Sequence, residues 1–224
     1  MKREEVAFFG KISAAMTHDI RNVLAIIRES SGLMGDLLSL IEDGSFKYHQ
    51  KFHSLVGTIQ DQVNRGVEMA TRFNQFAHSM DEDLSDVDMN ELIRRVVYLM
   101  QRFARLRKVE LAGAVGEQTV SIKADAFFMH RILGECIALV LKGVNEGATV
   151  TVAALPHAQG LELVVRTDDH HWPPETEAGA VEEEIRKMKD ALAIWGGSIN
   201  MIADTSHSGV SILFSRVPPA AQPG

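Results

Sequence analysis

The sequence has almost no cysteine, no long apolar run and no excess of positive charge. Cys136 is the only cysteine among 224 residues, so an internal disulfide bond is impossible and we expect a buried, inert thiol. No stretch approaches the roughly 18 apolar residues needed to cross a bilayer, and the charged start MKREEVAFFGK lacks the apolar core of a signal peptide. A net charge of −7 argues against nucleic-acid binding, which needs clustered Lys and Arg. We therefore expect a cytoplasmic protein with neither membrane nor nucleic-acid partners.

The N-terminal third carries two long amphipathic patterns. Apolar residues recur there at steps of three and four, which is typical of helices that bury one stripe against partner helices. The first stripe is Phe9, Ile12, Met16, Ile20, Val23, Ile27, Met34, Leu37 and Ile41, interrupted only by Ser30. The second is Phe52, Val56, Ile59, Val63, Gly66, Ala70, Phe73 and Ala77. A turn at 42–45 (EDGS) would join the two helices into a hairpin. One hairpin cannot cover both its apolar faces, so two copies forming a four-helix bundle, a homodimer, are predicted.

The rest of the chain alternates short strands with helices, after an acidic run at 80–86 that is typical of a solvated linker. We expect helices at Val87–Arg105, Phe127–Leu141 and Val181–Ala193. We expect strands at Val109–Ala112, Val120–Lys123, Thr149–Ala153, Leu161–Arg166, Ser198–Ile202 and Val210–Phe214. The predicted fold class is α+β, with a helical hairpin over 1–85, an α/β sandwich over 86–217 and a disordered tail over 218–224.

His18 lies away from the apolar stripe of the first helix. It is two residues from both Met16 and Ile20, a rotation of about 200°, so its imidazole is expected on the exposed face. Asp19 could orient that imidazole or accept a proton, and Asn22 lies one turn further along the same face. Small and basic residues near His18 are expected to meet a partner protein: Lys11, Ala15, Arg21 and Ala25. For the two basic residues, ordinary solvated charge is the alternative.

Several segments resemble the sensor histidine kinases of two-component systems. The string Thr17-His18-Asp19-Ile20-Arg21-Asn22 resembles their phosphoacceptor box. The other matching segments, in chain order, are VDMNEL at 87–92, KAD at 123–125, RIL at 131–133, LELVV at 161–165 and WGGSI at 195–199, the last resembling the kinase "HGGSI" element. The resemblance covers nearly the whole chain. It implies a dimerisation and phosphoacceptor hairpin joined to an ATPase-like domain.

The nucleotide site departs from that resemblance. In the register of the RIL segment, Glu135 and Leu139 stand where such kinases hold Mg²⁺ and ATP with two Asn; leucine cannot ligate Mg²⁺ and glutamate repels phosphates. Asp168 is retained and could face an adenine. The glycines of the first glycine box are replaced by His170 and Trp172, whose side chains block a close backbone approach. The second box is replaced by the acidic ETEAGAVEEE. We therefore expect Glu135, Leu139 and Asp168 to mark a vestigial nucleotide site.

A retained phosphoacceptor beside a degenerate nucleotide site resembles phosphotransferases descended from histidine kinases. The resemblance implies that the chain relays a phosphoryl group between His18 and aspartates of response-regulator receiver domains, with Asp19 and Asn22 as further catalytic residues and phosphatase activity as a side reaction. No cofactor or metal is expected on this chain, and Mg²⁺ would come from the regulator. Two alternatives are open: a divergent but active histidine kinase, and a non-enzymatic dimeric adaptor or inhibitor of a two-component pathway.

Overall fold

The computed structural model describes residues 3–39, 48–81, 84–116, 120–158, 160–203 and 207–215. The chain divides into two compact units, Met1–His78 and Ser79–Gly224. Within the described ranges, no helix combines the length and the apolar character that crossing a bilayer requires. The turn expected at 42–45 and the tail expected at 218–224 lie outside these ranges.

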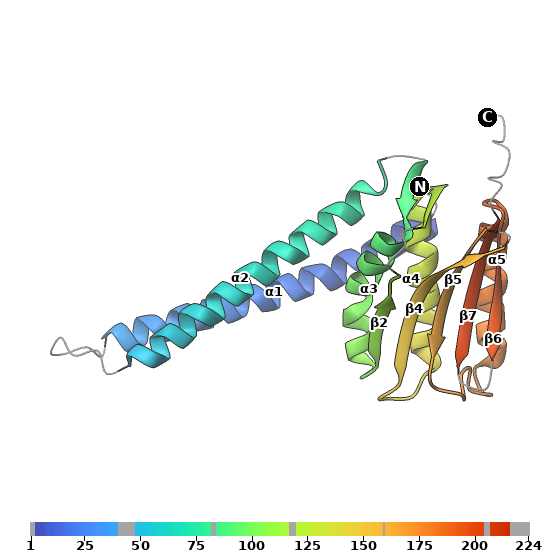
Figure 1. Cartoon of the computed structure of the whole chain (residues 1–224). Helices are drawn as coiled ribbons and strands as arrows, with labels where there is room; N and C mark the ends of the chain where they lie inside the picture. The colour runs from blue at the N-terminus through green and yellow to red at the C-terminus, as the bar shows by residue number, and fades with distance from the viewer. Residues whose placement is uncertain are drawn as a thin grey trace. The chain divides into compact units, whose positions relative to one another are not determined.

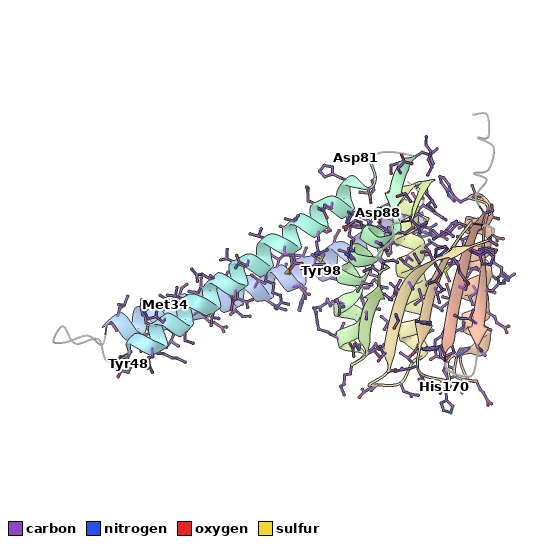
Figure 2. All side chains as sticks on the ribbon, in the orientation of Figure 1. Met34, Tyr48, Asp81, Asp88, Tyr98 and His170 are labelled. Carbon is purple, nitrogen blue, oxygen red and sulfur yellow. The ribbon has the colours of Figure 1, made fainter. Side chains whose placement is uncertain are left out.

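The first unit is a hairpin of two helices, α1 (Arg3–Ser39) and α2 (His49–His78) (Figure 1). Met34 on α1 and Tyr48, just before α2, lie at the same end of the hairpin (Figure 2). At the other end, Phe9 stacks on Phe76 with the ring centroids 5.7 Å apart. The two helices are therefore antiparallel, as the sequence predicts.

The structure confirms the apolar stripe predicted on α1 along its centre line. Five of its positions are buried: Ile12, Met16, Val23, Ser30 and Leu37. From Met16 onward, these buried residues are seven positions apart, so they recur on one side of the helix every two turns. Ser30, the only polar residue in the stripe, is therefore buried because of its position rather than its chemistry.

The second unit is an α/β sandwich built on a five-stranded mixed sheet. The strands, in the order β2-β4-β5-β7-β6, are β2 (Glu110–Ala114), β4 (Thr149–His157), β5 (Gly160–Thr167), β7 (Ser208–Ser215) and β6 (Gly197–Ala203). The β2–β4 pair is parallel and the other three pairs are antiparallel. Three helices cover one face of the sheet: α3 (Met89–Leu106), α4 (Ala126–Gly143) and α5 (Ala178–Ala193) (Figure 1). The expected fold class is confirmed, whereas the pairing of two hairpins into a bundle stays a prediction.

The core of this unit lies between the sheet and the helices. Leu163 of β5 pairs with Ile212 of β7, which pairs with Ile199 of β6, and all three side chains are at most 1% exposed. Side chains two residues apart on a strand share a face, so these rows build one apolar layer. At the other end of the sheet, a Cβ on Gly113 of β2 would lie 3.0 Å from Ile93 of α3. The helix and the strand thus pack closely at that glycine.

A small two-stranded sheet corrects the expected boundary between linker and helix. β1 (Ser85–Asp88) pairs antiparallel with β3 (Ser121–Ala124), with Val87 opposite Ile122. The sequence predicts a linker through residue 86 and a helix from Val87, and both are wrong at this junction. Asp88 caps α3 instead: its Oδ1 accepts the backbone N–H groups of Asn90 at 2.8 Å and Glu91 at 3.1 Å. A side-chain acceptor at this place starts the helix at the next residue.

Candidate functional site

The imidazole of His18 lies on the exposed side of α1, as the sequence predicts, with half of its side chain exposed. Its Nδ1 lies 3.3 Å from Oδ1 of Asp19 and 3.2 Å from Nδ2 of Asn22. The two contacts use opposite tautomers, because Nδ1 donates a hydrogen bond to the carboxylate and accepts one from the amide. Both neighbours meet the same ring nitrogen. The ring is therefore oriented through Nδ1.

Asp19 is much better shielded from water than His18. Only 15% of its side chain is exposed, against 50% for His18. The sequence places Asp19 about 100° round the helix from His18, so a contact requires an oblique side-chain conformation, and the structure has that contact. Hydrogen bonds to an ionised group strengthen when water is partly excluded. The Asp19 carboxylate is thus well placed to offset positive charge on the ring.

The surface expected to meet a partner is only partly exposed. Lys11 and Arg21 are exposed and Ala25 is half-buried. Ala15 does not fit the expected partner-binding surface, because only 6% of it is exposed. It lies one turn from Ile12 and directly before Met16, so it belongs to the edge of the buried stripe. Contact of Lys11, Arg21 or Ala25 with a partner stays a prediction.

Two positions that the sequence assigns to the vestigial nucleotide site lie on α4. One holds a buried leucine, and the other holds a glutamate that forms an ion pair. Leu139 is 7% exposed. Oε1 of Glu135 lies 3.2 Å from Nη1 of Arg131, whose side chain is only 6% exposed. The Arg131 guanidinium also lies 5.6 Å above the ring of Phe128, which stacks on Trp195 with centroids 5.5 Å apart. This ion pair and stack were not predicted, although arginine four residues before glutamate on a helix is a recognisable signal.

The third of these positions, Asp168, follows β5. Its Oδ1 accepts the backbone N–H of Thr149 at 2.8 Å, across the end of the β4–β5 pair. His170, at the first glycine position, lies exposed at the end of the sheet (Figure 2). The structure therefore keeps Asp168 and His170 at the end of the sheet, and Glu135 and Leu139 on α4.

Asp169 fixes the loop that follows β5. Its Oδ2 accepts both the backbone N–H of Asn145, at 2.8 Å, and the side-chain amide, at 2.9 Å. Its Oδ1 accepts the backbone N–H of His171 at 3.0 Å, and its carbonyl accepts the hydroxyl of Ser208 at 2.7 Å. Burial alone would raise the pKa of Asp169, but the hydrogen bonds from Asn145 and His171 outweigh it and hold the pKa below its ordinary value. Nothing in the sequence pattern indicates this role of Asp169.

Trp172, at the second glycine position, points inward and is 4% exposed. The sequence predicts that a bulky side chain here blocks the close approach of the backbone to a phosphate. It does not predict that the indole is buried. A Cβ on Gly143, at the end of α4, would lie 3.0 Å from both Cδ1 and Nε1 of the indole. The indole therefore packs directly on the helix, at a place where a larger side chain than glycine would crowd it.

Two further titratable groups lie inside the second unit. Burial lowers the pKa of His130 to about 4, although its Nδ1 lies 2.6 Å from the carbonyl of Ala126. Cys136 is fully buried, and burial raises the pKa of its thiol. The expectation of a buried cysteine is confirmed. Because both side chains are buried, neither can react with a partner at the surface.

The known proteins that match this sequence are sensor proteins, most of them named as histidine kinases. The chain is 20% identical over 166 residues to the signal transduction histidine-protein kinase AtoS of Escherichia coli K12, a match that covers 74% of this chain and 26% of AtoS. It is 24% identical over 143 residues to the sensor protein DegM of Bacillus sp. strain B21-2, covering 64% of this chain and 34% of DegM. The chain is homologous to sensor histidine kinases.

The homology covers only a part of those relatives. The chain spans about a quarter to a third of the length of the curated kinases that it matches. Among solved structures, the catalytic domain of the histidine kinase ThkA matches with a TM-score of 0.51 and 14% identity, over 61% of this chain and 99% of that domain. This match shows the fold of the second unit. No protein-family model matches the chain.

Proposed function

We propose that this histidine-kinase homologue is a phosphotransferase that relays a phosphoryl group between His18 and an aspartate of a response-regulator receiver domain. The exposed imidazole, whose Nδ1 faces the Asp19 carboxylate at 3.3 Å, is the observation that carries the proposal. A phosphoacceptor must be reachable by a second protein and must present one nitrogen in a fixed direction. The surroundings of His18 meet both requirements.

The transfer step uses Nε2 of His18, because Asp19 and Asn22 both contact the other ring nitrogen, Nδ1. With the Nδ1 proton donated to Asp19, the lone pair is on Nε2. Nε2 attacks the phosphorus of phosphoaspartate, the N–P bond forms, the P–O bond breaks and the regulator's aspartate leaves as a carboxylate. The Asp19 carboxylate offsets the positive charge that the ring acquires. The Mg²⁺ that neutralises the transferring oxygens would belong to the regulator.

Asn22 supports a second reaction at the same place. Its amide lies one helical turn beyond His18 on the same side of α1. An amide can hold a water molecule through both its oxygen and its nitrogen. A water held there would attack a docked phosphoaspartate, which would give the protein phosphatase activity.

The proposal does not require ATP. At the two positions where the resemblance places nucleotide-binding Asn residues, Leu139 is buried and Glu135 is paired with Arg131. An apolar side chain offers Mg²⁺ no oxygen, and a carboxylate near a triphosphate adds repulsion. We expect the phosphoryl group to arrive from a regulator rather than from ATP.

Exposed apolar side chains on the hairpin support a homodimer. Leu24 on α1 is 58% exposed, and Val63 and Val67, one turn apart on α2, are 47% and 62% exposed. An apolar stripe on a helix is stabilised when a partner helix removes it from water. A second hairpin would supply such helices and complete a four-helix bundle.

Phosphotransfer from receiver domains labelled with radioactive acetyl phosphate tests the proposal. Wild-type protein should acquire label from at least one receiver domain of a panel, and His18→Gln should acquire none. His53→Gln is the matched control, because His53 is also an exposed histidine of the hairpin and should leave labelling unchanged. Label on the His18→Gln protein would remove His18 from the mechanism. Wild-type protein that never takes label would leave the adaptor alternative.

A further inference from the structure

The two edges of the five-stranded sheet are protected to different degrees. An edge strand presents backbone N–H and C=O groups that can pair with a further strand, and proteins usually block such an edge with charges, proline or a covering side chain. At β2, the N–H of Glu110 bonds to the carbonyl of Ala148, directly before β4, so the next carbonyl, that of Leu111, faces the outer edge. The side-chain amide of Gln101 donates a hydrogen bond of 2.8 Å to that carbonyl. The edge at β2 is therefore blocked.

The opposite edge, β6, lacks charges and proline. Its sequence at 197–203 is GSINMIA. Among the described strands, β7 pairs with β6 along its whole length and no strand lies beyond it. Met201 lies two residues beyond the buried Ile199 on the same face, yet it is 43% exposed. β6 is therefore an open, uncharged edge with an exposed apolar side chain.

The β6 edge is complementary to itself. An antiparallel pairing of two copies about a two-fold axis at Asn200, the middle of the strand, uses the full length of both strands. Asn200 then faces Asn200 of the second copy, and a side-chain amide both donates and accepts hydrogen bonds. Met201 faces Ile199 of the second copy, which removes apolar surface from water. No like charges meet, because the strand has none.

Helix α5 extends this two-fold relation into the helical layer. It lies alongside β6 (Figure 1), and a Cβ on Gly197 would lie 3.1 Å from Cδ2 of Leu192. From that contact, Asn200 lies about 10 Å along the strand, at roughly 3.3 Å per residue. Ile185 lies about 10 Å back along the helix, at roughly 1.5 Å per residue. The turn after α5 reverses the chain, so the axis at Asn200 passes close to Ile185, near the middle of the helix.

The charges on α5 match the same axis. Glu182 and Lys189 are exposed, and they follow the buried residues Val181 and Met188 by one position. They are about two turns apart, so they lie on one flank of the helix, at similar distances from Ile185. A two-fold axis there places Glu182 of each copy opposite Lys189 of the other. Opposite charges at both ends of the contact favour this antiparallel arrangement over a parallel one, which would bring the two Glu182 side chains together.

We propose that β6 and α5 form a two-fold interface with a second copy of this chain, which joins two five-stranded sheets into one continuous sheet. This interface is separate from the hairpin contact proposed above, and the two together link chains into tetramers or longer assemblies. A contact of one strand and one helix is small, below the roughly 1,200 Å² of a typical stable interface, so its dissociation constant should be on the order of 100 µM. The contact therefore forms above the concentrations at which the hairpins are expected to associate.

Sedimentation equilibrium of Val67→Asp protein between about 10 and 500 µM tests the proposal, because this substitution is directed against the hairpin contact. The mass should double over this range, half-way at about 100 µM. Asn200→Lys in the same background should raise the dissociation constant at least about tenfold, since it places two like charges opposite each other. Asn200→Thr, an uncharged strand former, is the matched control and should associate like its parent. No increase in mass over this range, or an increase that survives Asn200→Lys, overturns the proposal.

Charge exchange on α5 tests the two-fold arrangement. In the Val67→Asp background, Glu182→Lys and Lys189→Glu should each raise the dissociation constant about fivefold, because each brings like charges together twice. The double exchange should restore the constant, which a merely structural effect on α5 would not do. Asp190→Lys is the control: it makes the same change of charge about 200° round the helix from the buried Met188 and should leave association unchanged. A double variant as weak as either single one overturns the arrangement.

Discussion

The amide nitrogen of Asn22 lies 3.2 Å from Nδ1 of His18, one turn further along α1. If Asn22 positions water rather than the phosphoryl group, Asn22→Ala should slow the release of free phosphate from a phosphorylated receiver domain by about 100-fold and spare transfer to His18. Two readouts are needed, label retained on this protein and label lost as phosphate. Equal slowing of both would mean that Asn22 orients the imidazole instead.

Asp19 should act on transfer itself. In Asp19→Asn the side chain keeps its size but loses the negative charge that faces Nδ1 at 3.3 Å. Because the phosphorylated ring then lacks its counter-charge, we expect the initial rate of His18 labelling to fall by about 100-fold. Rapid-quench measurement of labelling gives the rate, and Glu29→Gln, an exposed acidic position further along α1, is the control. An unchanged rate for Asp19→Asn would exclude a catalytic role for the carboxylate.

Self-association should depend on the exposed apolar face of the hairpin. Val67→Asp places a charge where a second hairpin is expected, so the dimer should weaken by several kcal/mol and the protein should become monomeric at micromolar concentration. Leu106→Asp is the matched control, because Leu106 is 68% exposed but lies on α3 of the second unit. Analytical ultracentrifugation distinguishes the species. A wild-type protein that is monomeric at this concentration would refute the bundle.

Stability should fall at mildly acidic pH because of His130. Burial lowers its folded-state pKa to about 4 from an ordinary 6.5, so the unfolded chain binds the proton more readily. The resulting stabilisation is complete above pH 6.5 and is lost as the pH falls toward 4, a loss of about 3 kcal/mol. Denaturant unfolding at several pH values should show this slope in the wild type and a reduced slope in His130→Gln. Parallel curves for the two proteins would assign the acid sensitivity to other groups.

The sequence predicts the elements whose periodicity is strong. The stripe through Val23 and Leu37 and the exposure of His18 follow from helical spacing alone, and the structure confirms them. Short-range patterns are less informative at boundaries. Val87 fits a strand as well as a helix, and only its pairing with Ile122, distant in sequence, decides for the strand.

Long-range packing explains what the sequence does not reveal about the degenerate site. The replacement of glycine by Trp172 is visible in the sequence, but the inward turn of the indole depends on Gly143, in a different element. The role of Asp169 likewise depends on Asn145, 24 residues away. Such partners become visible only when the fold brings the ends of α4 and β5 together.

The source of the phosphoryl group on His18 distinguishes a phosphotransferase from a kinase. Wild-type protein incubated with Mg²⁺ and radioactive ATP should stay unlabelled, whereas the same protein with a labelled receiver domain should become labelled, with the phosphate mapped to His18 by mass spectrometry. Label transferred from ATP to His18 without any other protein would show that the protein is an active kinase and not an ATP-independent phosphotransferase.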